Sequence, residues 1–178
     1  MNRGKSLIVI VSCSILFLFF CNCTDASRYS GDGRLIDNGL FAATDRYVLD
    51  LGVVELKKKG IYTYKINNLP SKNFVIGIEI RVSPEQHATI ENKKIRPLIS
   101  IELTNSQNIQ VIHNEASLDT WTWSVIGDTA FVYGEDQSST YFTPISNGKY
   151  NLRFVIINTD SSDIKYVARI LAKSGGWK

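Results

Sequence analysis

The fold is decided by residues 73–82, which read Asn73-Phe74-Val75-Ile76-Gly77-Ile78-Glu79-Ile80-Arg81-Val82. Every second residue from Phe74 to Val82 is large and apolar, and the positions between them include Gly77, Glu79 and Arg81. A period of two is typical of a β-strand that buries one face and exposes the other. The stretch therefore predicts a half-buried strand.

Segments with the same period lie on both sides of this stretch, separated by turn-forming residues. Further strands are expected near 34–36 and over residues 46–56, 61–67, 97–104, 109–113, 121–126, 129–133, 150–158 and 164–172. No window has a sustained helical period. About ten short strands predict an antiparallel all-β domain. Aliphatic strands and two long loops favour a jelly-roll-like β-sandwich over a small barrel. The expected core contains Ile76, Ile78, Ile80, Ile99, Ile101, Leu103, Leu152, Phe154 and Ile156.

Two of these strands have local features. Gly52 lies where the alternation shifts between Leu51 and Val54, which predicts a β-bulge. In the strand over 109–113, His113 shares a face with Ile109 and Val111. We expect His113 to be a strand-end residue with local hydrogen bonds rather than a catalytic base or metal ligand.

The N-terminal segment predicts export. It begins with Arg3 and Lys5 and continues with 15 mostly apolar residues, 7–21, before a polar exit at 22–27. A spanning helix needs about 20 apolar residues, so a signal peptide fits better; an uncleaved anchor that reaches residue 23 stays open. The expected organisation is an export signal over 1–23, a tether and first turn region over 24–44, and a single β-sandwich domain over 45–178.

Residues 18–23, Leu18-Phe19-Phe20-Cys21-Asn22-Cys23, resemble a bacterial lipoprotein signal. The resemblance implies that a cysteine after the apolar core carries lipid and becomes the mature N-terminus. That pattern has a small residue before the cysteine, and Asn22 meets it better than the residue before Cys21 does. Cys23 is therefore the expected lipidation site, with an ordinary signal cleaved near Ala26 as the alternative. The protein is expected in the periplasm or on the outer surface, anchored to a membrane.

Composition excludes several classes of function. Without Arg3 and Lys5 of the leader, 18 basic side chains face 17 acidic ones, and this balance argues against nucleic acid as a partner. All three cysteines, Cys13, Cys21 and Cys23, lie in the leader. Cysteine catalysis and a cysteine–zinc site are thus excluded for the domain. The Gly-x-Ser-x-Gly nucleophile signature is missing as well, and no cofactor is predicted.

Acidic residues offer two weak candidates for chemistry. Glu79 and Glu102 occupy outward positions of two strands and could face one groove as a glycosidase pair, although ordinary solvent-side roles are the stronger interpretation. Asp128, Glu135 and Asp136 cluster around a hairpin and could build a calcium site. Their spacing matches no EF-hand loop, so turn chemistry is favoured and no metal is predicted.

Aromatic residues are the remaining candidates for ligand binding. Trp121 and Trp123 share one strand face, and with Tyr141 they would resemble the stacking platform of carbohydrate-binding β-sandwiches. Because Val125 shares that face, we expect the indoles to point into the core instead. Trp177 follows two glycines and either closes one end of the sandwich or forms a partner-facing anchor.

These observations favour a non-enzymatic, envelope-associated and lipid-anchored binding or structural protein, with the membrane and a protein or glycan as partners. One alternative is a carbohydrate-binding module, and another is an immunity or inhibitor protein against a secreted effector. The run Lys57-Lys58-Lys59 is expected to be a solvated turn, with contact to anionic headgroups as the alternative.

Overall fold

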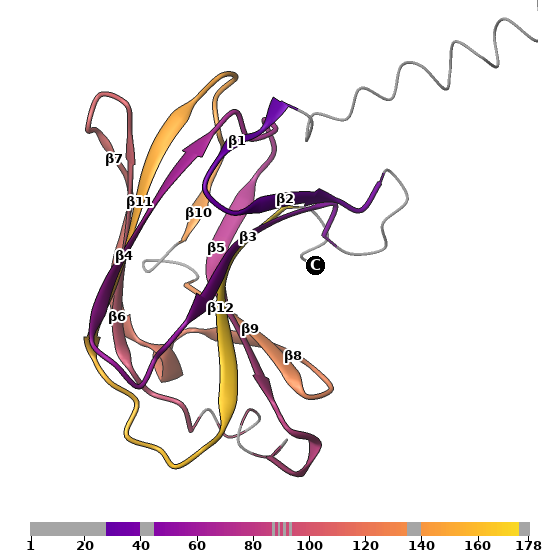
Figure 1. Ribbon diagram of the computed structural model, residues 1–178, viewed down its shortest axis with the longest axis vertical. Coiled ribbons are helices and arrows are strands. Elements are labelled where there is room, and N and C mark those ends of the chain that lie inside the picture. The colour runs from indigo at the N-terminus through magenta and orange to yellow at the C-terminus, as the bar shows by residue number, and fades with distance from the viewer. Residues whose placement is uncertain are drawn as a thin grey trace, which may run out of the picture.

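The computed structural model describes residues 28–39, 45–86, 88, 90, 92, 94–134 and 140–174. In these residues twelve strands form two antiparallel sheets that pack face to face (Figure 1). The predicted all-β sandwich is confirmed, with twelve strands rather than about ten. The two additional strands, β1 (Ser30–Gly31) and β10 (Tyr141–Phe142), are two residues long and cannot show an alternating pattern.

The five-stranded sheet has the order β1-β4-β11-β6-β7, with β4 at Gly60–Asn67, β11 at Lys149–Asn158, β6 at Leu98–Asn105 and β7 at Gln110–Ser117. The seven-stranded sheet has the order β2-β3-β12-β5-β9-β8, with β10 paired to β5. Its strands are β2 (Arg34–Asp37), β3 (Tyr47–Val54), β12 (Tyr166–Ser174), β5 (Phe74–Val82), β9 (Thr129–Tyr133) and β8 (Thr122–Ile126).

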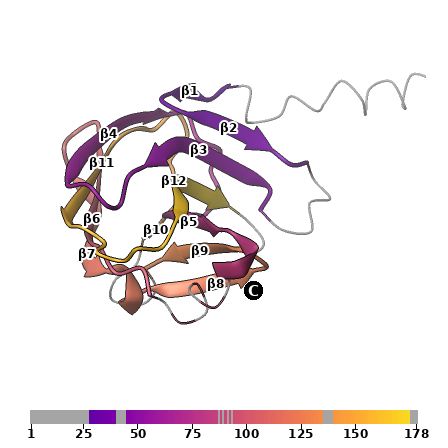
Figure 2. The ribbon, with the colours of Figure 1, turned by 60° about the horizontal axis from the view of Figure 1, so that its bottom comes forward.

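The chain changes sheet repeatedly (Figure 2). Successive strands alternate between the two sheets from β3 to β6 and again from β10 to β12, as expected for a jelly-roll-like sandwich. Two short 3₁₀ turns, Pro84–Gln86 and Leu118–Thr120, interrupt the strands. Among the described residues, no helix is long and apolar enough to cross a membrane.

The core lies between the sheets, and all nine residues expected there are at most 2% exposed. Ile78 pairs with Ile170 on one side and Val132 on the other, and all three are fully buried. Ile90 and Ile95 are also fully buried, although they belong to the polar interruption over residues 83–96. Burial of these two isoleucines explains how a polar loop is tied to the sandwich.

The predicted bulge in β3 is confirmed, and β7 also contains a bulge. Gly52 has a φ of +104° at the register shift between β3 and β12. A second bulge separates the pairs Leu103–Ile112 and Thr104–Gln110, so Val111 is the extra residue of β7. Val111 is therefore 40% exposed, while Ile112 is buried.

The sandwich starts earlier in the chain than residue 45. Within the region expected as a tether, β1 pairs with β4, and β2 pairs with β3. The glycines that indicated turns allow this close approach. A Cβ on Gly31 would lie 2.3 Å from the Lys65 carbonyl oxygen, and one on Gly33 would lie 2.4 Å from the Asp50 carbonyl oxygen. Both glycines also have positive φ values.

The outer face of the seven-stranded sheet is partly apolar. Val75, Phe131, Tyr133 and Leu171 form a second buried cluster there. The Phe131 ring lies over Gly77, where a Cβ would be 2.7 Å from the ring atom Cζ and 2.5 Å from the Val132 carbonyl oxygen. Glycine at position 77 therefore provides the space that the ring occupies.

One cation joins this cluster to two carboxylates. The Lys173 ammonium lies 3.5 Å from an Asp45 oxygen, 3.7 Å from a Glu79 oxygen and 4.4 Å from the centre of the Phe131 ring. Burial, and secondarily Glu79, raises the pKa of Asp45 above its ordinary 3.8, while Lys173 acts to lower it. The folded state thus holds a proton that the unfolded state releases at the same pH.

This arrangement predicts a pH-dependent loss of stability. Asp45 contributes its stability below pH 3.8, and loses it as the pH rises through its raised pKa. We expect Lys173→Met to raise that pKa further, so its melting temperature relative to that of the wild type should fall as the pH rises above 3.8. The control is Lys173→Arg, which keeps the charge. Parallel pH profiles for Lys173→Met and the wild type would contradict the assignment.

Candidate ligand-binding groove

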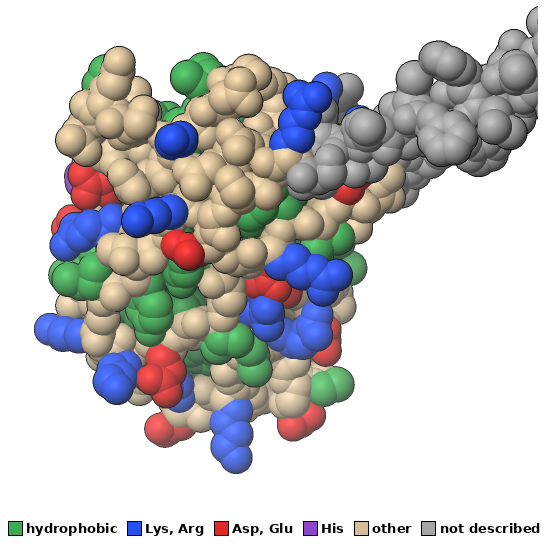
Figure 3. Space-filling model, turned by 45° about the horizontal axis from the view of Figure 1, so that its top comes forward, with side chains coloured by type: hydrophobic (Ala, Val, Ile, Leu, Met, Phe, Trp, Pro, Cys, Tyr) green, Lys and Arg blue, Asp and Glu red, His purple; other side chains and the backbone are tan. Residues whose placement is uncertain are grey.

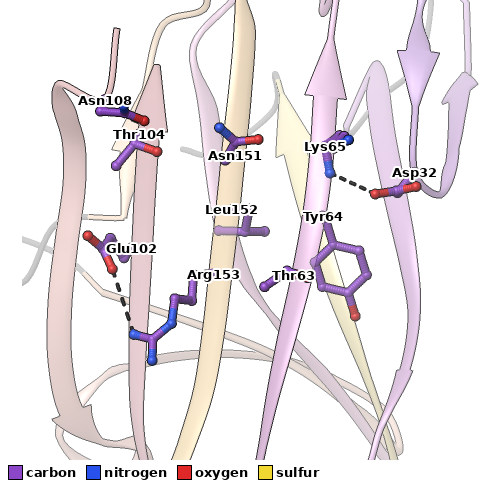
Figure 4. Close-up of a pocket in the computed structure, with 10 residues that line it drawn as sticks. All are labelled: Asp32, Thr63, Tyr64, Lys65, Glu102, Thr104, Asn108, Asn151, Leu152 and Arg153. Carbon is purple, nitrogen blue, oxygen red and sulfur yellow. Dashed lines mark hydrogen bonds and ion pairs between the residues drawn. The ribbon is translucent and has the colours of Figure 1, made fainter. Parts of the chain in front are cut away.

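A groove of about 370 Å³ opens on the outer face of the five-stranded sheet (Figure 4). Its floor consists of outward side chains on the adjacent strands β4, β11 and β6. Asp32, in the turn between β1 and β2, lies at one side. Asn108, in the turn between β6 and β7, lies at the other. The groove thus runs across three neighbouring strands.

The strand register arranges the floor in two polar rows. In the first row Asn151 of β11 lies between Lys65 of β4 and Thr104 of β6. In the second row Arg153 lies between Thr63 and Glu102. Outward positions repeat every second residue of a strand, so the two rows follow directly from the alternation that buries Leu152 and Phe154 beneath them.

The charged groups of the groove balance each other. An Arg153 nitrogen lies 3.8 Å from a Glu102 oxygen, and both side chains are partly exposed. An ion pair of this kind contributes only about 0–1 kcal/mol to stability. The fold therefore does not depend on the pair, and both groups stay accessible to a ligand.

Backbone contacts hold the two sides of the groove in place. The Lys65 N–H donates to an Asp32 carboxylate oxygen at 2.7 Å, and the Tyr29 hydroxyl donates to the Asp32 carbonyl oxygen. Burial, followed by the charge of Asp32, raises the pKa of Tyr29 to about 12. On the opposite side Asn105 accepts two backbone N–H bonds at 2.9 Å, and Asn108 has a φ of +58°. The first turn is thus bound to β4, and the second is built from local hydrogen bonds.

The geometry does not favour glycoside hydrolysis in the groove. Asp32 and Glu102 are its two carboxylates. Asp32 is bound at the outer edge of β4, two strand-to-strand steps from β6, and Lys65 shares a row with Thr104 rather than with Glu102. Two steps of about 4.8 Å and two residues along the strand place Lys65 and Glu102 about 12 Å apart, whereas glycosidase carboxylates lie about 5–9.5 Å apart. Glu79 cannot complete a pair, because it lies on the outer face of the other sheet. The suggestion that Glu79 and Glu102 face one groove is therefore wrong.

The aromatic residues do not form a platform. Trp121 is 2% exposed, which confirms its predicted place in the core. Trp123 is partly buried against that core, and its indole N–H donates to the Leu118 carbonyl oxygen at 2.8 Å. Tyr141 packs edge-on against Tyr133 at 6.0 Å, in the outer cluster of the seven-stranded sheet. The structure thus separates Tyr141 from both indoles.

Other predicted positions have these outcomes. Cys23 and Trp177 lie outside the described residues, as do Glu135 and Asp136. His113 lies on β7 directly opposite Glu102, beside the groove. In the part of the chain that the structure describes, no three His, Cys, Asp or Glu residues gather into a group that could hold a metal ion.

The groove was not identified from the sequence. Its residues are the ordinary polar positions of three strands, and they come together only because β11 lies between β4 and β6. The available signal was the repeated outward pair in each strand: Thr63 with Lys65, Glu102 with Thr104, and Asn151 with Arg153.

Comparisons with known proteins add little to this description. No protein-family model and no curated protein sequence matches the chain. A crystal structure of a protein from Sulfurospirillum deleyianum is similar over 73% of this chain and 98% of its own, with 10% sequence identity and a TM-score of 0.43.

Proposed function

We propose that this chain is a non-enzymatic, exported binding protein, held at the cell envelope by lipid on Cys23, whose groove on the five-stranded sheet binds a saccharide. The observation that carries the proposal is the groove itself, with two acidic side chains, two basic ones, two amides and two threonine hydroxyls around one hollow. The leader sequence supports export and anchoring.

A hydroxyl-rich neutral ligand suits this set of groups. Balanced charges give no net attraction for an anion or a cation. Each sugar hydroxyl can donate to a carboxylate or amide oxygen and accept from an amide, ammonium or guanidinium N–H. The side chains of Lys65, Asn151 and Arg153 offer such donors on adjacent strands, so several hydroxyls of one ligand can be bound together. Hydrogen bonds to charged groups are the stronger ones.

The test uses soluble oligosaccharides of glucose and of N-acetylglucosamine as probes. We expect one of them to shift the NMR signals of β4, β11 and β6. Losing one hydrogen bond to a charged group costs about 1.5–3 kcal/mol, so Arg153→Ala should weaken that binding by about tenfold or more. Arg81→Ala is the matched control, because Arg81 lies on a central strand but on the opposite outer face.

Two results would contradict the proposal. One is binding by the wild type that Arg153→Ala and Asn151→Ala leave unchanged, and the other is a set of shifted signals confined to the seven-stranded sheet. Release of new reducing ends from the bound oligosaccharide would contradict the non-enzymatic part.

A further inference from the structure

The described chain begins at one end of the sandwich. Arg28 lies in a shallow hollow with the β4–β5 loop, residues 68–72, and with Ser146 and Asn147 of the β10–β11 loop. The β6–β7 turn is at the same end, because Asn105 and Asn67 both lie at the start of β11 in the register. We call these three segments, residues 68–72, 105–109 and 143–149, the N-terminal end loops.

The run Lys57-Lys58-Lys59 lies at the opposite end. It directly precedes β4, whose first residue pairs with Ile156, whereas its last residue pairs with Lys149. Seven residue steps along β4 span about 24 Å. At this far end the Lys57 ammonium is already bound to the Ser162 carbonyl oxygen at 2.7 Å.

The short chain between Cys23 and Arg28 restricts how the domain can face a membrane. Five residue steps reach at most about 18 Å when fully extended. If Cys23 carries lipid, Arg28 stays within that distance of the bilayer surface. An inverted domain, with only its far end on the bilayer, would hold Arg28 about 24 Å above the surface, which the tether does not allow.

The charge of the N-terminal end loops suits an anionic surface. Lys72 and Lys149 lie in the loops, Arg28 lies beside them, and none of the three segments contains an Asp or Glu. In Figure 3 this end is turned toward the viewer. Most of its surface is uncharged, and Lys and Arg side chains lie among the uncharged groups. Asp37 and Asp45, at the same end of the other sheet, are paired with Arg46 and Lys173. Attraction between basic residues and anionic headgroups acts within a Debye length, about 8 Å in physiological salt.

Ile145 is placed to enter the interface. It is 68% exposed, and two hydrogen bonds of its own backbone groups hold its turn. The Ile145 N–H donates to the Tyr150 hydroxyl at 2.9 Å, and the Ile145 carbonyl oxygen accepts from the Gly148 N–H at 2.9 Å. An exposed aliphatic residue among basic ones is typical of a membrane-surface contact.

We infer that the N-terminal end loops are a membrane-contacting surface, in which Arg28, Lys72 and Lys149 bind anionic lipid headgroups and Ile145 enters the interface. The inference rests on the lipid anchor of the proposed function. It also directs the Lys57-Lys58-Lys59 turn away from the bilayer. The groove, which crosses the side of the domain, then stays open to ligands that approach along the membrane surface.

The experiment uses the full chain, expressed with its leader and purified in detergent. With Cys23 modified, a single introduced cysteine gives a unique labelling site, because the described domain contains none. Ile145→Cys and the control Lys58→Cys each carry a nitrobenzoxadiazole fluorophore. Both proteins are reconstituted into vesicles of phosphatidylethanolamine with phosphatidylglycerol, or of phosphatidylcholine alone.

At position 145 the emission should increase and shift to shorter wavelength on the anionic vesicles, with a smaller change on phosphatidylcholine. At position 58 neither vesicle should change it. Adding Lys72→Glu and Lys149→Glu should remove most of the change at position 145. Mass spectrometry of the same sample shows whether Cys23 carries lipid, and so distinguishes a failure of the membrane contact from a failure of the anchor. Lipidated protein with equal signals at positions 145 and 58 overturns this inference alone, whereas an unmodified Cys23 overturns both it and the proposed anchor.

Discussion

Replacing Trp121 by alanine should lower the free energy of unfolding by about 3–5 kcal/mol, the usual cost of removing a large buried aromatic side chain. Trp121 is 2% exposed, at the point where the chain leaves the 3₁₀ turn Leu118–Thr120 for β8. Its indole fills space between the two sheets. Urea unfolding of the variant and the wild type, followed by circular dichroism, measures the difference.

The matched control for this variant is Ile126→Ala on β8. Ile126 is 77% exposed, so its loss should change stability by no more than about 0.5 kcal/mol. Fluorescence gives an independent check. Trp177→Phe retains only Trp121 and Trp123, and its emission should be blue-shifted and poorly quenched by iodide. Strong quenching, or equal stability of the Trp121→Ala and Ile126→Ala variants, would show that the indoles form an exposed platform.

Alternation predicts strands and their buried faces well where pairing is regular. Ile76, Ile78 and Ile80 are fully buried because β5 pairs without interruption to β12 and β9. The shift at Gly52 was also visible, because the pattern changes face on both sides of a glycine. In these segments the local period alone determines which side chains face the core.

The alternating pattern does not predict burial where tertiary contacts determine which side chains are buried. The bulge at Val111 was not predicted, because no glycine marks it. Ile90 and Ile95 are buried by their contacts with the sandwich, in a stretch that has no strand period. The groove depends on which strands are neighbours, and many strand orders are compatible with ten alternating segments. Asn151 and Lys65 are 86 positions apart in the sequence and face each other only in the folded sheet.

Two consecutive residues of β11 should differ in how much their substitution lowers stability. Phe154 is fully buried and packs edge-on against Tyr62 at 6.2 Å, whereas Arg153 points into the groove on the opposite face. Phe154→Ala should lower the free energy of unfolding by about 3–5 kcal/mol through lost burial and a cavity. Arg153→Ala removes a partly exposed ion pair and should cost at most about 1 kcal/mol.

Saccharide affinity should show the reverse order for these two variants. Measured by titration calorimetry at a temperature where both are folded, Arg153→Ala should lose most of its binding, while Phe154→Ala should bind nearly as tightly as the wild type. The reason is that the outward row of β11 contacts the saccharide in the proposed binding mode, whereas the inward row holds the strand against the second sheet. If Arg153→Ala unfolds as readily as Phe154→Ala, Arg153 is part of the fold. Equal affinities would instead place the binding site on another face of the sandwich.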